Sequence, residues 1–142
     1  MRAVSSAGAA VLLALSAGPL WAAEKEVEAE LKAVVVANME AAEKKDLEGI
    51  KATVHTQSPA YLGTVDAMRK LFEHYDLRYE LVSLRYVGSD GDYAFAHGSQ
   101  KTKKVQGPAF KDNTVDSVYV FRKEEGKWKL WQQAVLEVKY AE

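Results

Sequence analysis

Residues 112–140 constrain the fold more than any other part of the sequence, because they predict a β-hairpin. Two runs rich in Val, Tyr, Phe and Trp flank the segment 124–126, which reads Glu-Glu-Gly. A short loop with Gly in its last place is typical of a three-residue hairpin with a bulged turn. This register places Tyr119 opposite Trp131 and leaves apolar residues on both faces. Because a solvent-facing strand pair is polar on one side, we expect something to cover each face.

The length and charge of the chain favour one globular domain. The chain has 142 residues and a net charge of −1, and 27% of its residues are charged. A domain of this size can build a core without covalent cross-links, and the sequence contains no cysteine. Surfaces that bind nucleic acids show a basic excess, which this chain lacks, so we expect no nucleic-acid partner.

The first 22 residues predict a secretory signal peptide. Arg2 supplies a basic start, residues 9–15 are apolar, and residues 16–23 are small and contain helix breakers. We expect cleavage after Ala22, a single domain over 23–142, and a periplasmic or secreted location. The apolar run is shorter than the ~20 residues that span a bilayer, so we expect no membrane segment after cleavage. An uncleaved N-terminal anchor is the alternative.

Three helices and then four strands are predicted. Apolar residues recur at helical spacing over 24–45, Asp46 can cap a short second helix, and Thr64 can cap a third. The apolar period changes to two over 77–87 and 93–105, and the hairpin follows. Helices that lie on one side of an antiparallel sheet define the α+β class. The predicted fold is therefore α+β, with three N-terminal helices packed on an antiparallel sheet of four long strands.

This order of elements resembles the nuclear-transport-factor-2-like superfamily, and most of all its small SnoaL-like and ketosteroid-isomerase-like members. The matching stretches are the helix start at 46–50, the segment 55–59 with its proline, and the ending 120–130. The resemblance implies a curved sheet wrapped on helices, which forms a cone with a pocket at its wide end. Members include isomerases, hydratases, cyclases and modules without activity, so the fold does not settle the function.

A set of aromatic and polar residues is expected to line the cone pocket. Asn113, Asp116 and Gln100 would be the polar positions of an otherwise apolar site, which is the usual make-up of a small-ligand site. The alternative is that the tyrosines are core or interface residues with a solvated hydroxyl. The predicted lining comprises Tyr61, Phe72, Tyr75, Gln100, Asn113, Asp116 and Trp128.

The candidates for acid–base chemistry are His55 and Asp116. Isomerases of the superfamily use a carboxylate base beside hydrogen-bond donors in a dry cavity, where burial raises a carboxyl pKa. An exposed helix-end residue is the alternative interpretation of His55. The three histidines show no metal-binding spacing, and no nucleophile motif or cofactor fingerprint occurs, so we expect neither a metal nor a cofactor.

The sequence therefore predicts an exported module that binds a small apolar or amphipathic molecule, or a protein, without catalysis. The alternatives are an acid–base enzyme of the isomerase, hydratase or cyclase type, and an assembly module with a filled cone. Since all helices precede the sheet, one apolar sheet face should stay uncovered and form a homodimer interface. A strongly coiled sheet that buries this face within one subunit is the competing account. The uncovered set would be Tyr119, Phe121 and Trp131, or alternatively Val118, Val120 and Leu130.

Overall fold

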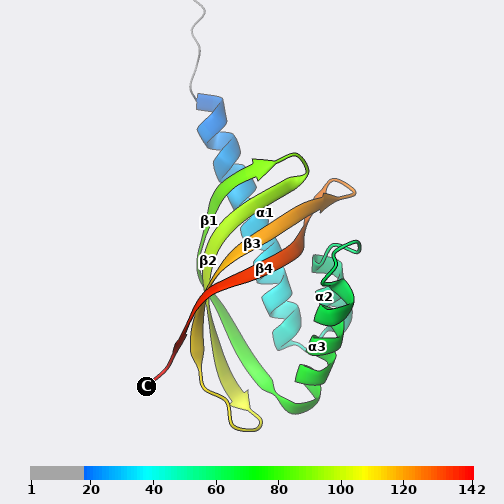
Figure 1. Cartoon of the computed structure of the whole chain (residues 1–142), viewed down its shortest axis with the longest axis vertical. Coiled ribbons are helices and arrows are strands. Elements are labelled where there is room, and N and C mark those ends of the chain that lie inside the picture. Colours follow the sequence, from blue (N-terminus) through cyan, green and yellow to red (C-terminus); the bar gives the residue numbers. More distant parts are fainter. Residues whose placement is uncertain (1–17) are drawn as a thin grey trace, which may run out of the picture.

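The computed structural model describes residues 18–142, and most of the predicted signal peptide lies outside them. Three helices precede a four-stranded antiparallel meander, as predicted (Figure 1). Within residues 18–142, none of the helices combines the length and the apolar character that crossing a bilayer requires. The helices are α1 (Gly18–Glu43), α2 (Leu47–Thr53) and α3 (Tyr61–His74), and the strands are β1 (Asp76–Asp90), β2 (Tyr93–Gln106), β3 (Asn113–Glu124) and β4 (Lys127–Tyr140).

The helix boundaries follow local hydrogen bonds. The Asp46 carboxylate accepts a 3.0 Å hydrogen bond from the backbone N–H of Gly49 and so caps α2, as predicted. Helix α3 begins at Tyr61, earlier than the predicted cap at Thr64. The reason is Ser58, whose hydroxyl accepts from the Ala60 N–H and whose carbonyl accepts from the Tyr61 N–H, so the helix can begin one turn sooner.

The β3–β4 hairpin has a two-residue turn, so the predicted three-residue loop is wrong. Glu124 pairs with Lys127, and the turn residues Glu125 and Gly126 both have positive φ, at 51° and 77°. Two left-handed residues in succession make the type I′ turn that matches the twist of the flanking strands. The turn shifts the pairing by one residue and a β-bulge at Trp131 shifts it by one more, so Tyr119 faces Gln133, and not Trp131 as predicted.

A β-bulge in β4 then changes which residues share a face. Trp131 is an extra residue between the pairs Val120–Gln132 and Phe121–Leu130. Trp128 and Leu130 consequently lie on the same face as Phe121, whereas the prediction placed them with Val118 and Val120. Trp131 instead lies beside Tyr93 and Arg122, with the Arg122 guanidinium 4.8 Å from its ring centroid.

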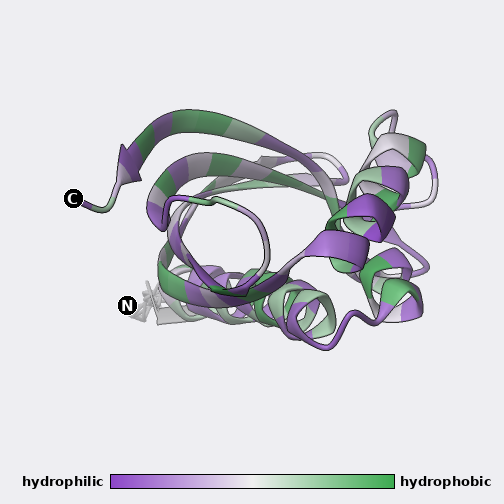
Figure 2. Ribbon diagram, turned by 90° about the horizontal axis from the view of Figure 1, so that it is seen from below, coloured by the Kyte–Doolittle hydropathy of each residue, from purple (hydrophilic) through white to green (hydrophobic). Residues whose placement is uncertain are grey.

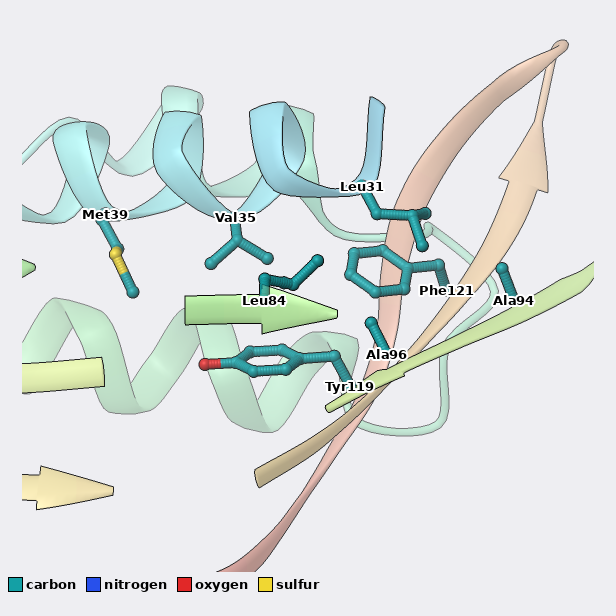
Figure 3. Close-up of a cluster of buried hydrophobic side chains, with 8 residues drawn as sticks. All are labelled: Leu31, Val35, Met39, Leu84, Ala94, Ala96, Tyr119 and Phe121. Atoms are coloured by element: carbon teal, nitrogen blue, oxygen red, sulfur yellow. The ribbon is translucent and has the colours of Figure 1, made fainter. Parts of the chain in front are cut away.

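The core forms where α1 crosses the inner face of the sheet. Seen from below, the curved sheet arches over α1, and α2 and α3 close one side (Figure 2). Three side chains of α1 project onto the residues of β1, β2 and β3 beneath them (Figure 3). Phe121 is fully buried and Tyr119 is 2% exposed, so β3 supplies the centre of the core. The cluster comprises Leu31, Val35, Met39, Leu84, Ala94, Ala96, Tyr119 and Phe121.

Within residues 18–142, no helix packs on the outer face of the sheet. No helix follows β4, and α1 packs on the inner face, so Val118 and Val120 remain partly exposed. The register places Val120 beside Phe95 of β2, and Val118 beside Ala134 of β4. The face is thus partly buried within the chain, and both the dimer and the coiled-sheet account, in which one subunit buries this face, stay predictions. Neither predicted uncovered set is correct as a whole. Tyr119 and Phe121 of the first set and Leu130 of the second lie on the inner face, which α1 covers.

Candidate binding groove

An apolar groove of about 440 Å³ lies between α1, α2 and the tip of the β3–β4 hairpin. Helix α1 supplies one wall, the end of α2 supplies a second, and the hairpin supplies the third. The lining comprises Glu30, Ala33, Val34, Ala37, Ala52, Thr53, Gly126, Lys127, Trp128 and Lys129.

Small side chains on α1 create the space in this groove. Ala33 and Ala37 are four residues apart, so they lie on one side of the helix, and both are exposed. Larger residues at these positions would fill the groove. Helix α1 thus presents Leu31, Val35 and Met39 to the core and a neighbouring stripe of small residues to the groove.

Trp128 links the groove to the core. Its ring is half-buried, packs beside the core cluster, and also lines the groove. Its Nε1–H is buried and has no hydrogen-bond partner within residues 18–142. A buried donor without an acceptor is costly, so an acceptor that reached this N–H would gain a favourable hydrogen bond.

Charged side chains stand on two sides of the groove. Glu30 lies on α1, and Lys127 and Lys129 lie on β4. The Lys129 ammonium donates to the carbonyl of Ala52 at the end of α2, which ties the hairpin to that helix. The groove therefore offers an apolar floor with an anionic side and a cationic side.

His55 is buried and holds the connector after α2 against the hairpin. Its side chain is 3% exposed, so the interpretation as an exposed helix-end residue is wrong. Nε2–H donates to the Lys123 carbonyl at 3.2 Å, and Nδ1 lies 3.1 Å from the Gln57 N–H and 3.2 Å from a carboxylate oxygen of Glu124. Both ring nitrogens thus have partners inside the protein, and this residue is not part of the groove.

Asp116 and the buried tyrosine hydroxyls do not converge. Alternation along β3 places Asp116 on the outer face, opposite Ser99 and Glu137, while Tyr119 points into the core. Burial raises the pKa of Tyr119 to about 12, and its hydroxyl donates to Gln100 at 2.8 Å. Burial and then the nearby Glu43 charge raise the pKa of Tyr79 to about 12. The carboxylate and the phenol are therefore not the acid–base pair of one cavity.

The other predicted lining residues are dispersed. Phe72 packs against the small cluster around Ile50, and Tyr61 is the half-buried first residue of α3. The ring centroids of Tyr75 and Phe110 are 5.9 Å apart. The Asn113 amide donates to the Lys111 carbonyl. Of the seven predicted residues, only Trp128 lines the groove. Within residues 18–142, no three His, Cys, Asp or Glu side chains lie close enough together to hold a metal ion.

Comparison with known protein families assigns the chain to one of them. The model of the C-terminal domain of the anti-sigma-I factor RsgI9 matches residues 33–141. The chain belongs to this family. The match includes every groove residue except Glu30, because it does not extend to residues 1–32. The comparison with curated proteins gave no match.

Solved structures show the fold of this member of the RsgI9 C-terminal-domain family. A candidate aromatic ring hydroxylase from Novosphingobium aromaticivorans is 13% identical, with a TM-score of 0.67 over 82% of this chain and 94% of its own. A candidate dehydratase of the NTF2-like family from Streptomyces avermitilis is 18% identical, with a TM-score of 0.63 over 80% and 99%. A candidate scytalone dehydratase from N. aromaticivorans is 11% identical, with a TM-score of 0.63 over 85% and 92%. These likenesses confirm the NTF2-like cone fold.

Sequence reasoning missed most of the groove in this family member. Ala33 and Ala37 on α1, and Ala52 and Thr53 on α2, are small residues that resemble ordinary helix fillers. The available signal was the pair of alanines four residues apart beside the apolar stripe of α1. The contribution of Lys129 depends on how the hairpin docks on α2, which the sequence pattern does not specify.

Proposed function

We propose that the chain is an exported, non-enzymatic module that binds a small amphipathic molecule in the groove between α1, α2 and the hairpin. The observation that carries the proposal is the composition of that groove. Its volume is about 440 Å³, its floor is apolar, and its charged groups are few. Clefts of a few hundred Å³ with these features are typical of small-ligand sites.

The lining indicates the chemistry of the ligand. A flat apolar body would contact Ala33, Ala37 and the ring of Trp128. An anionic group would lie toward Lys127, whose ammonium stands at the hairpin side of the groove. The proposed ligand is therefore an aromatic or alicyclic molecule that carries one anionic group.

The acid–base enzyme has less support from the geometry. Asp116 lies on the outer face, away from the Tyr119 hydroxyl, and both nitrogens of His55 are bonded within the protein. The family is named after a domain of an anti-sigma factor, which is a regulatory protein, and this supports binding over catalysis. Export is supported by the N-terminal pattern and by the exposure of Leu20 and Trp21, which the core does not use.

The proposal includes a homodimer through the outer face of the sheet. Phe95, Val118, Val120 and Ala134 are neighbours there, and each is partly or fully exposed. A two-fold axis would let this surface cover itself. Light scattering of the parent and of Val118→Asp tests this interface, because a charge in its centre should separate the subunits.

The groove is tested with the fluorescent probe 1-anilinonaphthalene-8-sulfonate, which combines an apolar ring system with one anionic group. Ala37→Trp should fill the groove and abolish the rise in probe fluorescence. Lys32→Trp is the matched control, because Lys32 is an exposed residue of α1 that lies outside the groove and off the side of the helix that carries Ala33 and Ala37. Equal binding by the parent and by both variants would contradict the groove as the binding site.

A further inference from the structure

Within residues 18–142, no other segment pairs with the outer side of the last part of β4, which therefore forms an open sheet edge. Every residue from 132 to 140 is exposed, although this stretch is fully extended strand. The exposed fraction is 56% for Val135, 60% for Leu136, 40% for Val138 and 63% for Tyr140. Strand edges with large apolar residues pair readily with another strand, and proteins usually protect them.

The other edge positions of this sheet are covered from within the chain. On β1, the N–H groups of Tyr79 and Tyr86 donate to carboxylates of α1, at 2.7 Å to Glu43 and 2.8 Å to Glu28. Each carboxylate satisfies a backbone donor that would otherwise be open to pairing. These two positions of the β1 edge are thus protected by α1.

The first part of the β4 edge is covered by the connector between α2 and α3. The His55 N–H donates to the Leu130 carbonyl at 2.9 Å, and the Ser58 hydroxyl donates to the Trp131 carbonyl at 2.6 Å. Val54 also forms a parallel bridge with Leu130. This cover ends at Trp131, and the open edge begins at the next residue.

We propose that residues 136–140 of β4 pair antiparallel with the same segment of a second copy, which joins two four-stranded sheets edge to edge. The Ala141 N–H points toward β3, because it donates to the Asp112 carbonyl at 2.8 Å. Backbone groups alternate along a strand, so the N–H and C=O of Val138 and Tyr140 point to the open edge. A two-fold axis at Val138 would therefore create a hydrogen-bonded pair of the two Val138 residues.

Charge complementarity identifies a second copy as the partner. With the axis at Val138, Glu137 lies opposite Lys139 of the partner subunit, and the reverse pair forms on the other side of the axis. Both side chains are exposed, and within one chain they are already 3.4 Å apart. Opposite charges in directly facing positions stabilise a strand pair, whereas like charges would destabilise it. The segment is thus complementary to itself.

The shape of the molecule leaves room for this pairing. The end of β4 projects from the body, with no helix beside it (Figure 1). Hydrophobic and hydrophilic residues alternate along this end (Figure 2). Edge pairing uses a different surface from the outer-face interface proposed above, so either interface can form without the other.

Single engineered cysteines test the register, because the chain contains no cysteine. Val138→Cys places the two sulfurs at the proposed axis, where the Cα separation of a hydrogen-bonded pair permits a disulfide. Under mild oxidation this variant should form a covalent dimer, while Val105→Cys, an exposed position on β2, should not. Equal cross-linking of the two variants would overturn the register.

The mass in solution tests the pairing itself. Val138→Pro removes an N–H that points to the open edge and leaves the β3–β4 ladder intact, so it should lower the mass measured by light scattering. The mass should fall in either case: to that of the monomer without the outer-face interface, and to that of the outer-face dimer with it. A Val138→Pro variant with the mass of the parent would overturn edge pairing, whereas an unchanged mass for Val118→Asp would count only against the outer-face interface.

Discussion

Gly98 of β2 lies so close to the ring of Tyr119 that a methyl group on Gly98 would stand 2.8 Å from Cε2 of that ring. The same methyl group would lie 3.1 Å from the backbone carbonyl oxygen of Ser83. Both distances are shorter than ordinary van der Waals contact, and the carbonyl cannot move without disturbing β1. The absence of a side chain at position 98 therefore allows Tyr119 to lie flat on the sheet.

We predict that Gly98→Ala destabilises the fold. Overpacking a dense core costs about 1–3 kcal/mol of unfolding free energy. Urea unfolding followed by circular dichroism measures the change. Gly88→Ala is the control, because a methyl group there meets no atom within 4 Å. Equal losses for the two variants would contradict the close packing of Tyr119.

A second prediction concerns the centre of the core. Phe121 is surrounded by core side chains and has 0% solvent exposure. Phe121→Ala should therefore cost about 3–5 kcal/mol of unfolding free energy. Trp131→Ala should cost less, because Trp131 is only half-buried and lies outside the core cluster. Thermal or urea unfolding of both variants checks the order. If Trp131→Ala lost more unfolding free energy than Phe121→Ala, the position of the bulge at Trp131 would be contradicted.

The order of elements could be predicted from the sequence, but the pairing within the hairpin could not. Apolar periodicity separates the three helices from the four strands over most of the chain. The turn was ambiguous because Gly126 ends both a two-residue and a three-residue loop, and only the positive φ of Glu125 distinguishes them. The bulge at Trp131 depends on the docked connector at Ser58, which is a contact between distant segments.

The candidate site was harder to predict than the fold. The groove is created by the absence of bulk at Ala33 and Ala37, and missing side chains leave little trace in a sequence. His55 has the residue type of a catalytic base, but its burial and two hydrogen bonds give it a positioning role. Which interpretation holds depends on the tertiary contacts of its two nitrogens.

A third prediction concerns the alkaline pH dependence of stability. The pKa of Tyr119 is raised to about 12, whereas a tyrosine in the unfolded chain has a pKa near 10. The folded state therefore holds this proton more tightly. Its contribution to stability is complete below about pH 10 and is lost as the pH rises toward 12.

Tyr119→Phe should therefore lose less stability than the parent between about pH 10 and pH 12. The comparison uses the free energy of unfolding in urea at several pH values in this range. Tyr79 has a similarly raised pKa, so some dependence should remain in the variant. If the free energy of unfolding fell equally with pH in the parent and the variant, Tyr119 would not be buried as a neutral phenol.

A fourth prediction concerns the N-terminal segment. The exported protein should begin at Ala23, which the intact mass of the secreted or periplasmic product determines. A chain that lacks residues 1–22 should unfold at the same temperature as the full chain, because Leu20 and Trp21 are exposed and the first buried residue of α1 is Leu31. An exported product that still carries Met1 would contradict cleavage.

The indole N–H signals in a ¹⁵N-correlated NMR spectrum test the binding groove most directly. The chain has three tryptophans, and only Trp128 lines the groove. Trp128→Phe assigns its signal. On titration with 1-anilinonaphthalene-8-sulfonate, the indole signal of Trp128 should shift while that of Trp131 stays in place. Saturable binding that shifts Trp131 and leaves Trp128 unchanged would contradict the groove as the ligand site.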